Sequence, residues 1–197
     1  MKRIIYLLTF IITLTLVGCN KVDNSKVVSN FDKKIEVVYS KGDIKKVKKL
    51  LKSYGTSHDL TIKKVKNREI LVIKDGIIKE NENLWNEFFT NTKNNKESYI
   101  IILQYTPQND PILTYLSYKN NEYYMLEDDS RDKFREGEKE DYYEYTFKYL
   151  KLFEENEKVY VYLLDDDKIT LEKLNYSLLS SKIDEWIPYG FVFYYNK

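Results

Sequence analysis

The sequence predicts an α+β fold: a mainly antiparallel sheet with a central meander, packed against two or three amphipathic helices. Segments with strand patterns cluster after segments with helical spacing, which is the order typical of this class. Short connections rich in Asn, Asp and Gly join several successive strand segments, as antiparallel hairpins require. The chain is 43% hydrophobic and 15% aromatic, which is enough to build a core. We find neither an internal repeat nor a second domain boundary, so residues 31–197 are predicted to form one domain.

Three segments carry the signals of amphipathic helices. The first is predicted to begin at Asp43 and to end before Gly55, the second to begin at Asn83, and the third at Thr170. Their apolar residues recur at helical spacing: Ile44, Val47, Leu50 and Leu51 in the first, Leu84, Trp85, Phe88 and Phe89 in the second, and Leu171, Leu174, Leu178 and Leu179 in the third. Lysines occupy the other face of the first helix. Such a face is usually solvated, but it also suits contact with anionic lipid or wall polymer.

Strand patterns are clearest over residues 99–105, 112–118 and 123–127. Asn120 and Asn121 tolerate the positive φ of a tight hairpin, so these three segments are predicted to form an antiparallel meander. Further strands are predicted over 60–66, 69–74, 142–152, 159–164 and 191–195.

The N-terminus has the pattern of a secretory signal. Lys2 and Arg3 precede an uncharged apolar run over residues 4–17. A helix of that length spans about 21 Å, short of the ~30 Å hydrocarbon core of a bilayer, which favours a signal peptide over a membrane-spanning helix. The alternative interpretation is an unprocessed membrane-anchoring helix.

The end of this run, Leu16-Val17-Gly18-Cys19, resembles the lipobox of bacterial lipoproteins. The resemblance implies transfer of diacylglycerol to the Cys19 sulfur and cleavage after Gly18. Residues 1–18 would then be the signal peptide, the polar residues 19–30 a tether, and the mature protein would be held at the outer face of the cytoplasmic membrane. An odd Cys in an exported protein needs an explanation, and lipidation supplies one.

Composition excludes several classes of site. With 32 Lys+Arg against 31 Asp+Glu, the chain lacks the basic excess of most nucleic-acid-binding proteins, so no nucleic-acid partner is expected. One Cys and one His exclude an intramolecular disulfide, a zinc finger and a His-rich metal site, and the six Gly include neither GxGxxG nor a Walker A loop. No metal, no cofactor and no catalytic residue is predicted.

The stretch from about 70 to 153 resembles an uncharacterised family of small lipoproteins from Gram-positive bacteria, catalogued as a domain of unknown function. Its distinctive blocks are Thr-x-x-x-Asp-Pro-Ile at residues 106–112 and Asp-Ser-Arg-Asp at residues 129–132. The matching residues also include Ile73-Lys74-Asp75-Gly76 and the Trp85/Phe88 helix. The resemblance implies an extracytoplasmic lipoprotein and attaches no activity to it.

Two clusters are candidate binding sites. Arg131, with Asp129 and Asp132, lies on a predicted loop, where it suits a clamp on a carboxylate or phosphate. We favour the other interpretation, in which Arg131 pairs with one of these acids or another nearby acid and pins the end of a strand. Tyr143, Tyr145, Phe147 and Tyr149 share one face of the predicted strand 142–152, either as a stacking platform or, as we favour, as core. In the core arrangement Phe147 is nearly inaccessible and at least two of the three Tyr are more than half buried.

The sequence favours a non-enzymatic, lipid-anchored module that binds a protein, peptide or glycan at the cell membrane or wall. The alternatives are a cell-wall or carbohydrate hydrolase that uses Asp/Glu carboxylates, and a structural accessory of a membrane complex. Two carboxylates about 5–9 Å apart in a deep cleft would favour the hydrolase. A shallow surface lined by Tyr would favour binding.

Overall fold

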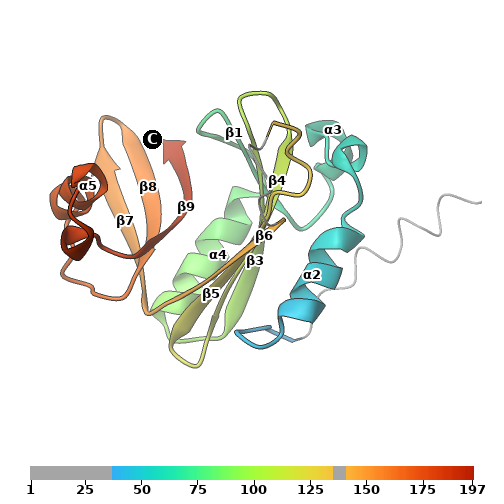
Figure 1. Ribbon diagram of the computed structural model, residues 1–197. Coiled ribbons are helices and arrows are strands. Elements are labelled where there is room, and N and C mark those ends of the chain that lie inside the picture. The colour runs from blue at the N-terminus through green and yellow to red at the C-terminus, as the bar shows by residue number, and fades with distance from the viewer. Residues whose placement is uncertain (1–36, 135–140) are drawn as a thin grey trace, which may run out of the picture.

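The computed structural model describes residues 37–134 and 141–197 (Figure 1). The predicted signal peptide and tether lie outside this part of the chain. Its helices are α2 (Ile44–Ser53), α3 (Ile62–Val65), α4 (Glu82–Lys93) and α5 (Leu171–Leu179). Its strands are β1 (Leu71–Lys74), β2 (Ile77–Glu80), β3 (Ser98–Tyr105), β4 (Pro111–Lys119), β5 (Glu122–Asp128), β6 (Tyr142–Phe147), β7 (Tyr149–Glu155), β8 (Lys158–Leu164) and β9 (Tyr189–Asn196).

The strands form two sheets, and the mixed helix and strand content with largely antiparallel pairing agrees with the predicted class. A six-stranded sheet has the order β2-β1-β3-β4-β5-β6, and a three-stranded sheet has the order β7-β8-β9. All neighbours pair antiparallel except β1 and β3, which are parallel. The predicted three-stranded meander is not a separate central unit, because the consecutive pairing continues through β6 to the edge of the sheet.

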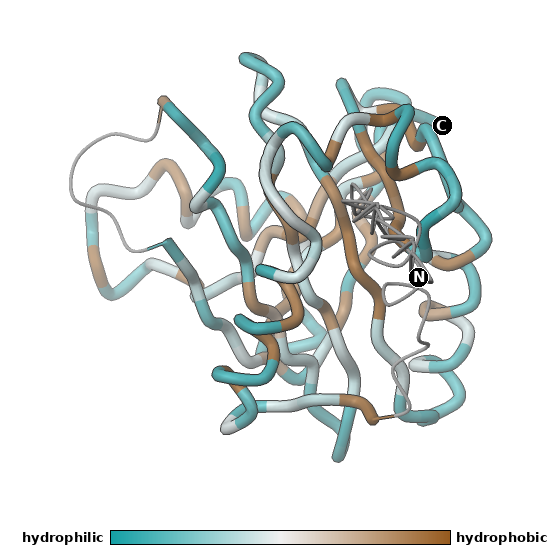
Figure 2. Tube along the Cα trace, turned by 90° about the vertical axis from the view of Figure 1, so that its right-hand side faces the viewer, coloured by the Kyte–Doolittle hydropathy of each residue, from teal (hydrophilic) through white to brown (hydrophobic). Residues whose placement is uncertain are grey.

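Both faces of the six-stranded sheet are covered, because its strands alternate apolar side chains to either side. On one face, Val47 and Leu51 of α2 and Val65 of α3 pack against β1, β3, β4 and β5. On the other face, Trp85 and Phe88 of α4 share a core cluster with residues of β8 and β9, so this core joins the two sheets. Figure 1 shows α2 and α3 on one side of the sheet and the β7–β9 sheet with α5 on the other. Figure 2 shows the hydrophobic residues concentrated along the interior strands, with hydrophilic residues at the turns.

Two strand predictions are wrong. In the segment 60–66, Ile62–Val65 form a single turn of helix, α3, and both Leu60, which precedes the helix, and Val65 at its end reach the α2-side core. The pairing partner of β1 is instead β2, which follows the Asp75-Gly76 turn. The segment 142–152 is interrupted at Lys148, and its two halves, β6 and β7, belong to different sheets.

The helix predictions are correct in place and differ in detail. Asp43 and Thr170 are the N-cap residues of α2 and α5, as predicted, and the Thr170 hydroxyl accepts a hydrogen bond from the Lys173 N–H. The helix α4 begins after Asn81 rather than at Asn83, since the Asn81 amide donates to the carbonyls of Arg68 and Ile70 and ties the helix start to the segment just before β1.

The predicted leucine stripe of the last helix is only partly buried. Leu174 and Ser177 of α5 face the core, whereas Leu178 and Leu179 are exposed. The helix is nine residues long and covers one end of a small sheet, so it has a narrow contact face.

Candidate binding site

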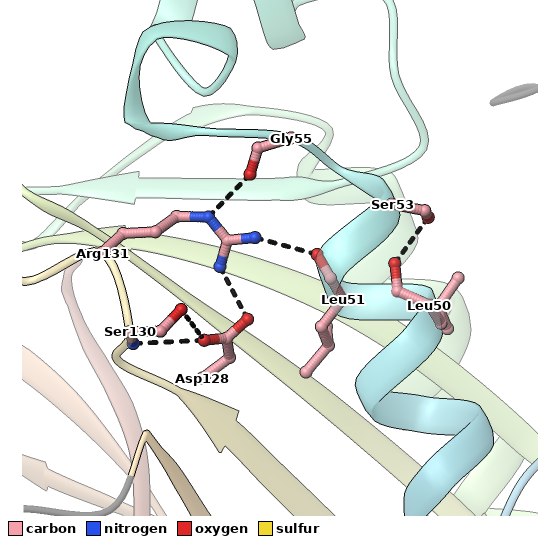
Figure 3. A network of polar contacts seen from close by, with 7 residues as sticks. All are labelled: Leu50, Leu51, Ser53, Gly55, Asp128, Ser130 and Arg131. Carbon is pink, nitrogen blue, oxygen red and sulfur yellow. Dashed lines mark hydrogen bonds and ion pairs between the residues drawn. The ribbon is translucent and has the colours of Figure 1, made fainter.

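Arg131 lies in a buried network of polar contacts at the end of β5 (Figure 3). Its Nη1 is 2.6 Å from Oδ2 of Asp128, and the two side chains are 8% and 0% exposed. Its Nε donates to the Gly55 carbonyl at 2.9 Å and its Nη2 to the Leu51 carbonyl at 3.0 Å. The other carboxylate oxygen of Asp128 accepts from the backbone N–H and the hydroxyl of Ser130.

This geometry supports the structural interpretation of Arg131. All three of its nitrogen atoms are engaged inside the protein, and two of them bond to carbonyls at and just beyond the C-terminal end of α2, where cations are favoured. The predicted pairing with an acid at the strand end is confirmed, and the acid is Asp128. Asp129 is also buried, and Asp132 accepts a hydrogen bond from the Phe134 N–H in the loop that follows.

The predicted aromatic row does not form one surface. Tyr143, Tyr145 and Phe147 point to the α4 side of β6, whereas Tyr149 belongs to β7 in the other sheet. Phe147 is 7% exposed and Tyr143 and Tyr145 are half-buried, so the predicted core role is confirmed for these three residues, whereas Tyr149 is 39% exposed. The opposite face of β6 is also partly buried, because Tyr142 packs beneath α2, with the Lys48 ammonium 4.4 Å from its ring centre.

A cavity of about 750 Å³ opens where the chain leaves β6 for β7. Its walls come from the end of α4 and the turn after it, from the β4–β5 hairpin, and from the break between β6 and β7. The lining residues are Thr92, Asn95, Tyr118, Asn120, Asn121, Glu122, Tyr123, Lys148, Tyr149 and Leu150.

The polar wall of this cavity is organised around Tyr118. Its hydroxyl lies 2.9 Å from the amide oxygen of Asn95 and 3.2 Å from that of Asn121, and its ring packs on Tyr123 with centroids 4.8 Å apart. The Tyr118 hydroxyl has a single hydrogen, so it can donate to only one of these oxygens at a time, and the Asn95 and Asn121 amides supply both donors and acceptors at the cavity wall.

Local chain geometry explains why amides line the cavity. Asn95, Asn120 and Asn121 all have positive φ, between 54° and 61°, a conformation that Asn adopts more readily than most residues. The tight hairpin at 120–121 was predicted from sequence, but its contribution to a cavity was not. The sequence shows Asn-rich turns and Tyr-rich strand ends as separate features. Only the pairing of β4, β5 and β6 brings them together at a cavity.

Glu127 is a second group that was not predicted from the sequence. It is half-buried on β5, on the α4 side of the sheet, between Thr114 of β4 and Tyr143 of β6. Burial, together with the smaller effect of the nearby negative charge of Asp129, raises its pKa to about 7. An acidic residue in register with the inward-facing Tyr123 and Met125 was the available signal. Glu127 does not line the cavity.

Within residues 37–134 and 141–197, no group of three or more His, Cys, Asp and Glu side chains is placed to hold a metal ion. Among the helices of the same residues, none is long and apolar enough to cross a membrane.

Most of the residues described above lie in a segment that matches the sequence model of a known protein family. The sequence model of a family described as a domain of unknown function, DUF4362, matches residues 67–162. The match covers 96 of the 197 residues, just under half of the chain. The matched segment contains the whole six-stranded sheet, α4, every residue lining the cavity, and the Arg131–Asp128 bridge. The helix α2 precedes it, and α5 and β9 follow it. No curated protein and no solved structure matches the chain.

Proposed function

We propose that this protein is a non-enzymatic binding module, held by a lipid on Cys19 at the outer face of the cytoplasmic membrane, whose cavity takes a glycan. The cavity beside Tyr149 carries the binding part of the proposal. The lipobox at residues 16–19 carries the anchoring part.

The lining chemistry suits a neutral, polyhydroxylated ligand. Amide NH₂ groups of Asn95 and Asn121 can donate to sugar hydroxyls, and Glu122 and Lys148 add an acceptor and a donor at the rim. The ring of Tyr149 is 39% exposed and offers an apolar face on which a sugar ring can stack. Specific sites typically combine a few polar groups with aromatic surface in this way.

The lining favours binding over hydrolysis. Glycoside hydrolases use two carboxylates that flank the scissile bond. Among the described residues that line this cavity, Glu122 is the only acidic one. The raised pKa of Glu127 is the property of a possible general acid, but Glu127 lies outside the cavity lining.

The binding part is tested by titrating soluble peptidoglycan fragments into the protein in a calorimeter. Tyr149→Ala should weaken binding about tenfold, because losing a stacking face of ~1.4 kcal/mol corresponds to that factor. Tyr176→Ala, which removes an exposed Tyr on α5, is the matched control and should leave the affinity unchanged. Equal loss in both variants, or shortened glycan products after incubation, would contradict the proposal.

The anchoring part is tested in cells with Cys19→Ala. The variant should accumulate as an uncleaved precursor and lose metabolic labelling by fatty acid, since the thiolate is the group that takes the lipid. Normal processing and labelling of the variant would rule out a lipid on Cys19.

A further inference from the structure

The positive charge of this protein is concentrated in one short segment. Residues 41–68 contain ten Lys and Arg and two Asp, a net charge of +8, whereas the whole chain carries +1. All other residues together therefore carry −7. This segment comprises α2, the 3₁₀ turn Ser57–Asp59 and α3, which cover one face of the six-stranded sheet (Figure 1).

Three lysines of α2 form an exposed face, at the edge of which the Lys52 ammonium lies 5.9 Å from the centre of the Tyr142 ring. Val47 and Leu51 are buried, whereas Lys45, Lys49 and Lys52, spaced four and three residues apart, are exposed along one stripe. Lys46 is paired with Asp43 at 2.7 Å, but within the described residues none of the three stripe lysines forms a salt bridge. We call these three residues the lysine stripe.

The chain enters the fold on the same side of the sheet as the lysine stripe. The Tyr39 carbonyl accepts a hydrogen bond from the Ser117 hydroxyl at 2.7 Å, and the Tyr39 N–H donates to the Tyr115 hydroxyl at 2.9 Å. Tyr39 and Tyr115 both belong to the core cluster on which α2 packs. Residue 37 therefore lies on the α2 side, and the 18 residue steps from there back to Cys19 reach at most about 65 Å.

We propose that the lysine stripe docks on anionic phospholipid headgroups of the membrane that holds Cys19; the proposal rests on the lipid anchoring argued above. A lysine near an anionic membrane surface contributes about 1 kcal/mol, and a lipid on Cys19 would keep the stripe within reach of that surface at high effective concentration. The lysine stripe would orient the folded domain relative to the membrane, because acyl chains on Cys19 fix only the end of the tether.

Docking in this way would direct the cavity away from the bilayer. Tyr118 and Tyr123, which line the cavity, belong to the core cluster on the α4 side of the sheet, opposite α2. A membrane-facing α2 thus leaves the cavity open toward the compartment in which a glycan would be met.

The test uses the mature chain, residues 19–197, with Cys19→Ser, so that no lipid contributes to binding. Cosedimentation is measured with vesicles of equal parts phosphatidylglycerol and phosphatidylcholine, and with vesicles of phosphatidylcholine alone. The protein should bind the first and not the second, and binding should weaken as salt is raised. Lys45→Gln/Lys49→Gln/Lys52→Gln should reduce partitioning by roughly tenfold or more.

The matched control is Lys79→Gln/Lys96→Gln/Lys173→Gln, which removes the same charge from exposed positions on β2, the turn after α4, and α5. It should bind the anionic vesicles within about twofold of the parent chain, because distant charges are screened. Equal loss in both triple variants, or equal binding to neutral vesicles, would overturn the proposal. Tighter binding to soluble polyphosphate than to anionic vesicles would assign the stripe to a polyanionic polymer and would also overturn it.

The result of the vesicle-binding experiment is independent of the test of anchoring at Cys19. The vesicle experiment lacks the lipid, so a failure there counts against the lysine stripe alone. A failure of Cys19 labelling counts against the anchoring and leaves the vesicle result standing as a property of the folded domain.

Discussion

Arg131 joins two parts of the chain that are far apart in sequence, the end of α2 and the end of β5. Its bond to Asp128 is shielded from water, and its other donors meet carbonyl oxygens at and just beyond the end of the helix. Removing one partner of such a pair leaves the other buried and uncompensated, which costs more than the pair contributes.

Arg131→Ala should therefore lower the free energy of unfolding by about 3–5 kcal/mol, measured by denaturant titration. Lys46→Ala breaks an ion pair of similar length with Asp43 on the surface of α2 and should cost less than about 1 kcal/mol. An unchanged midpoint for Arg131→Ala, with loss of ligand binding, would assign Arg131 to a binding role instead.

Glu127 predicts a pH dependence of stability. Its ordinary pKa is 4.5, and burial in the folded protein raises the pKa to about 7. Between these values the unfolded chain releases the proton while the folded protein retains it, so the contribution of Glu127 to stability is fully present below pH 4.5 and is lost as the pH rises through 7.

Glu127→Gln should remove that fall. The free energy of unfolding of the parent protein, minus that of the variant, should decrease by about 1–3 kcal/mol from pH 4 to pH 8. Taking the difference cancels the other carboxyl groups that titrate over this range. A flat difference would mean that Glu127 is solvated in the folded protein.

At the scale of elements, the sequence predicted the strands 99–105, 112–118 and 123–127 to within about two residues, because alternation and turn residues are local signals. The prediction of secondary structure was wrong where a local pattern is compatible with both a helix and a strand. The segment 60–66 alternates apolar and polar residues, yet Ile62–Val65 form a helical turn, with Leu60 and Val65 both buried. Nothing local distinguishes a four-residue helix from a short strand.

The break at Lys148 is likewise invisible in the pattern. The aromatic alternation from Tyr143 to Tyr149 continues across it without interruption. The chain nevertheless changes sheets there, because β6 pairs with β5 and β7 pairs with β8. This change of sheets also places Lys148 and Tyr149 at the cavity.

At the scale of the whole molecule, Phe147 lies where the two sheets meet. It belongs to the core cluster that includes Trp85 of α4 and Phe193 of β9, and its ring approaches Gly190 so closely that a Cβ there would come within 3.0 Å. Gly190 therefore allows β9 to pack directly on the end of β6.

Phe147→Ala should lower the free energy of unfolding by about 3–5 kcal/mol, since it opens a cavity between the sheets. Leu179→Ala, at a residue 88% exposed on α5, is the control and should cost less than about 0.5 kcal/mol. Thermal unfolding followed by circular dichroism measures both. A small loss for Phe147→Ala would show that the two sheets do not share one core.

The sequence by itself determined the class of fold, the helix starts at Asp43 and Thr170, the hairpin at Asn120-Asn121, and the pairing of Arg131 with an acid at a strand end. These follow from side-chain periodicity, from capping, and from the few residues that accept positive φ, all of which act over a few neighbouring positions. Only the tertiary structure decided which acid pairs with Arg131, that Tyr143 and Tyr149 belong to different sheets, and that Asn95 meets Tyr118 at a cavity. Those outcomes depend on which strands become neighbours, because contacts between residues distant in sequence are set by the packing of the whole core.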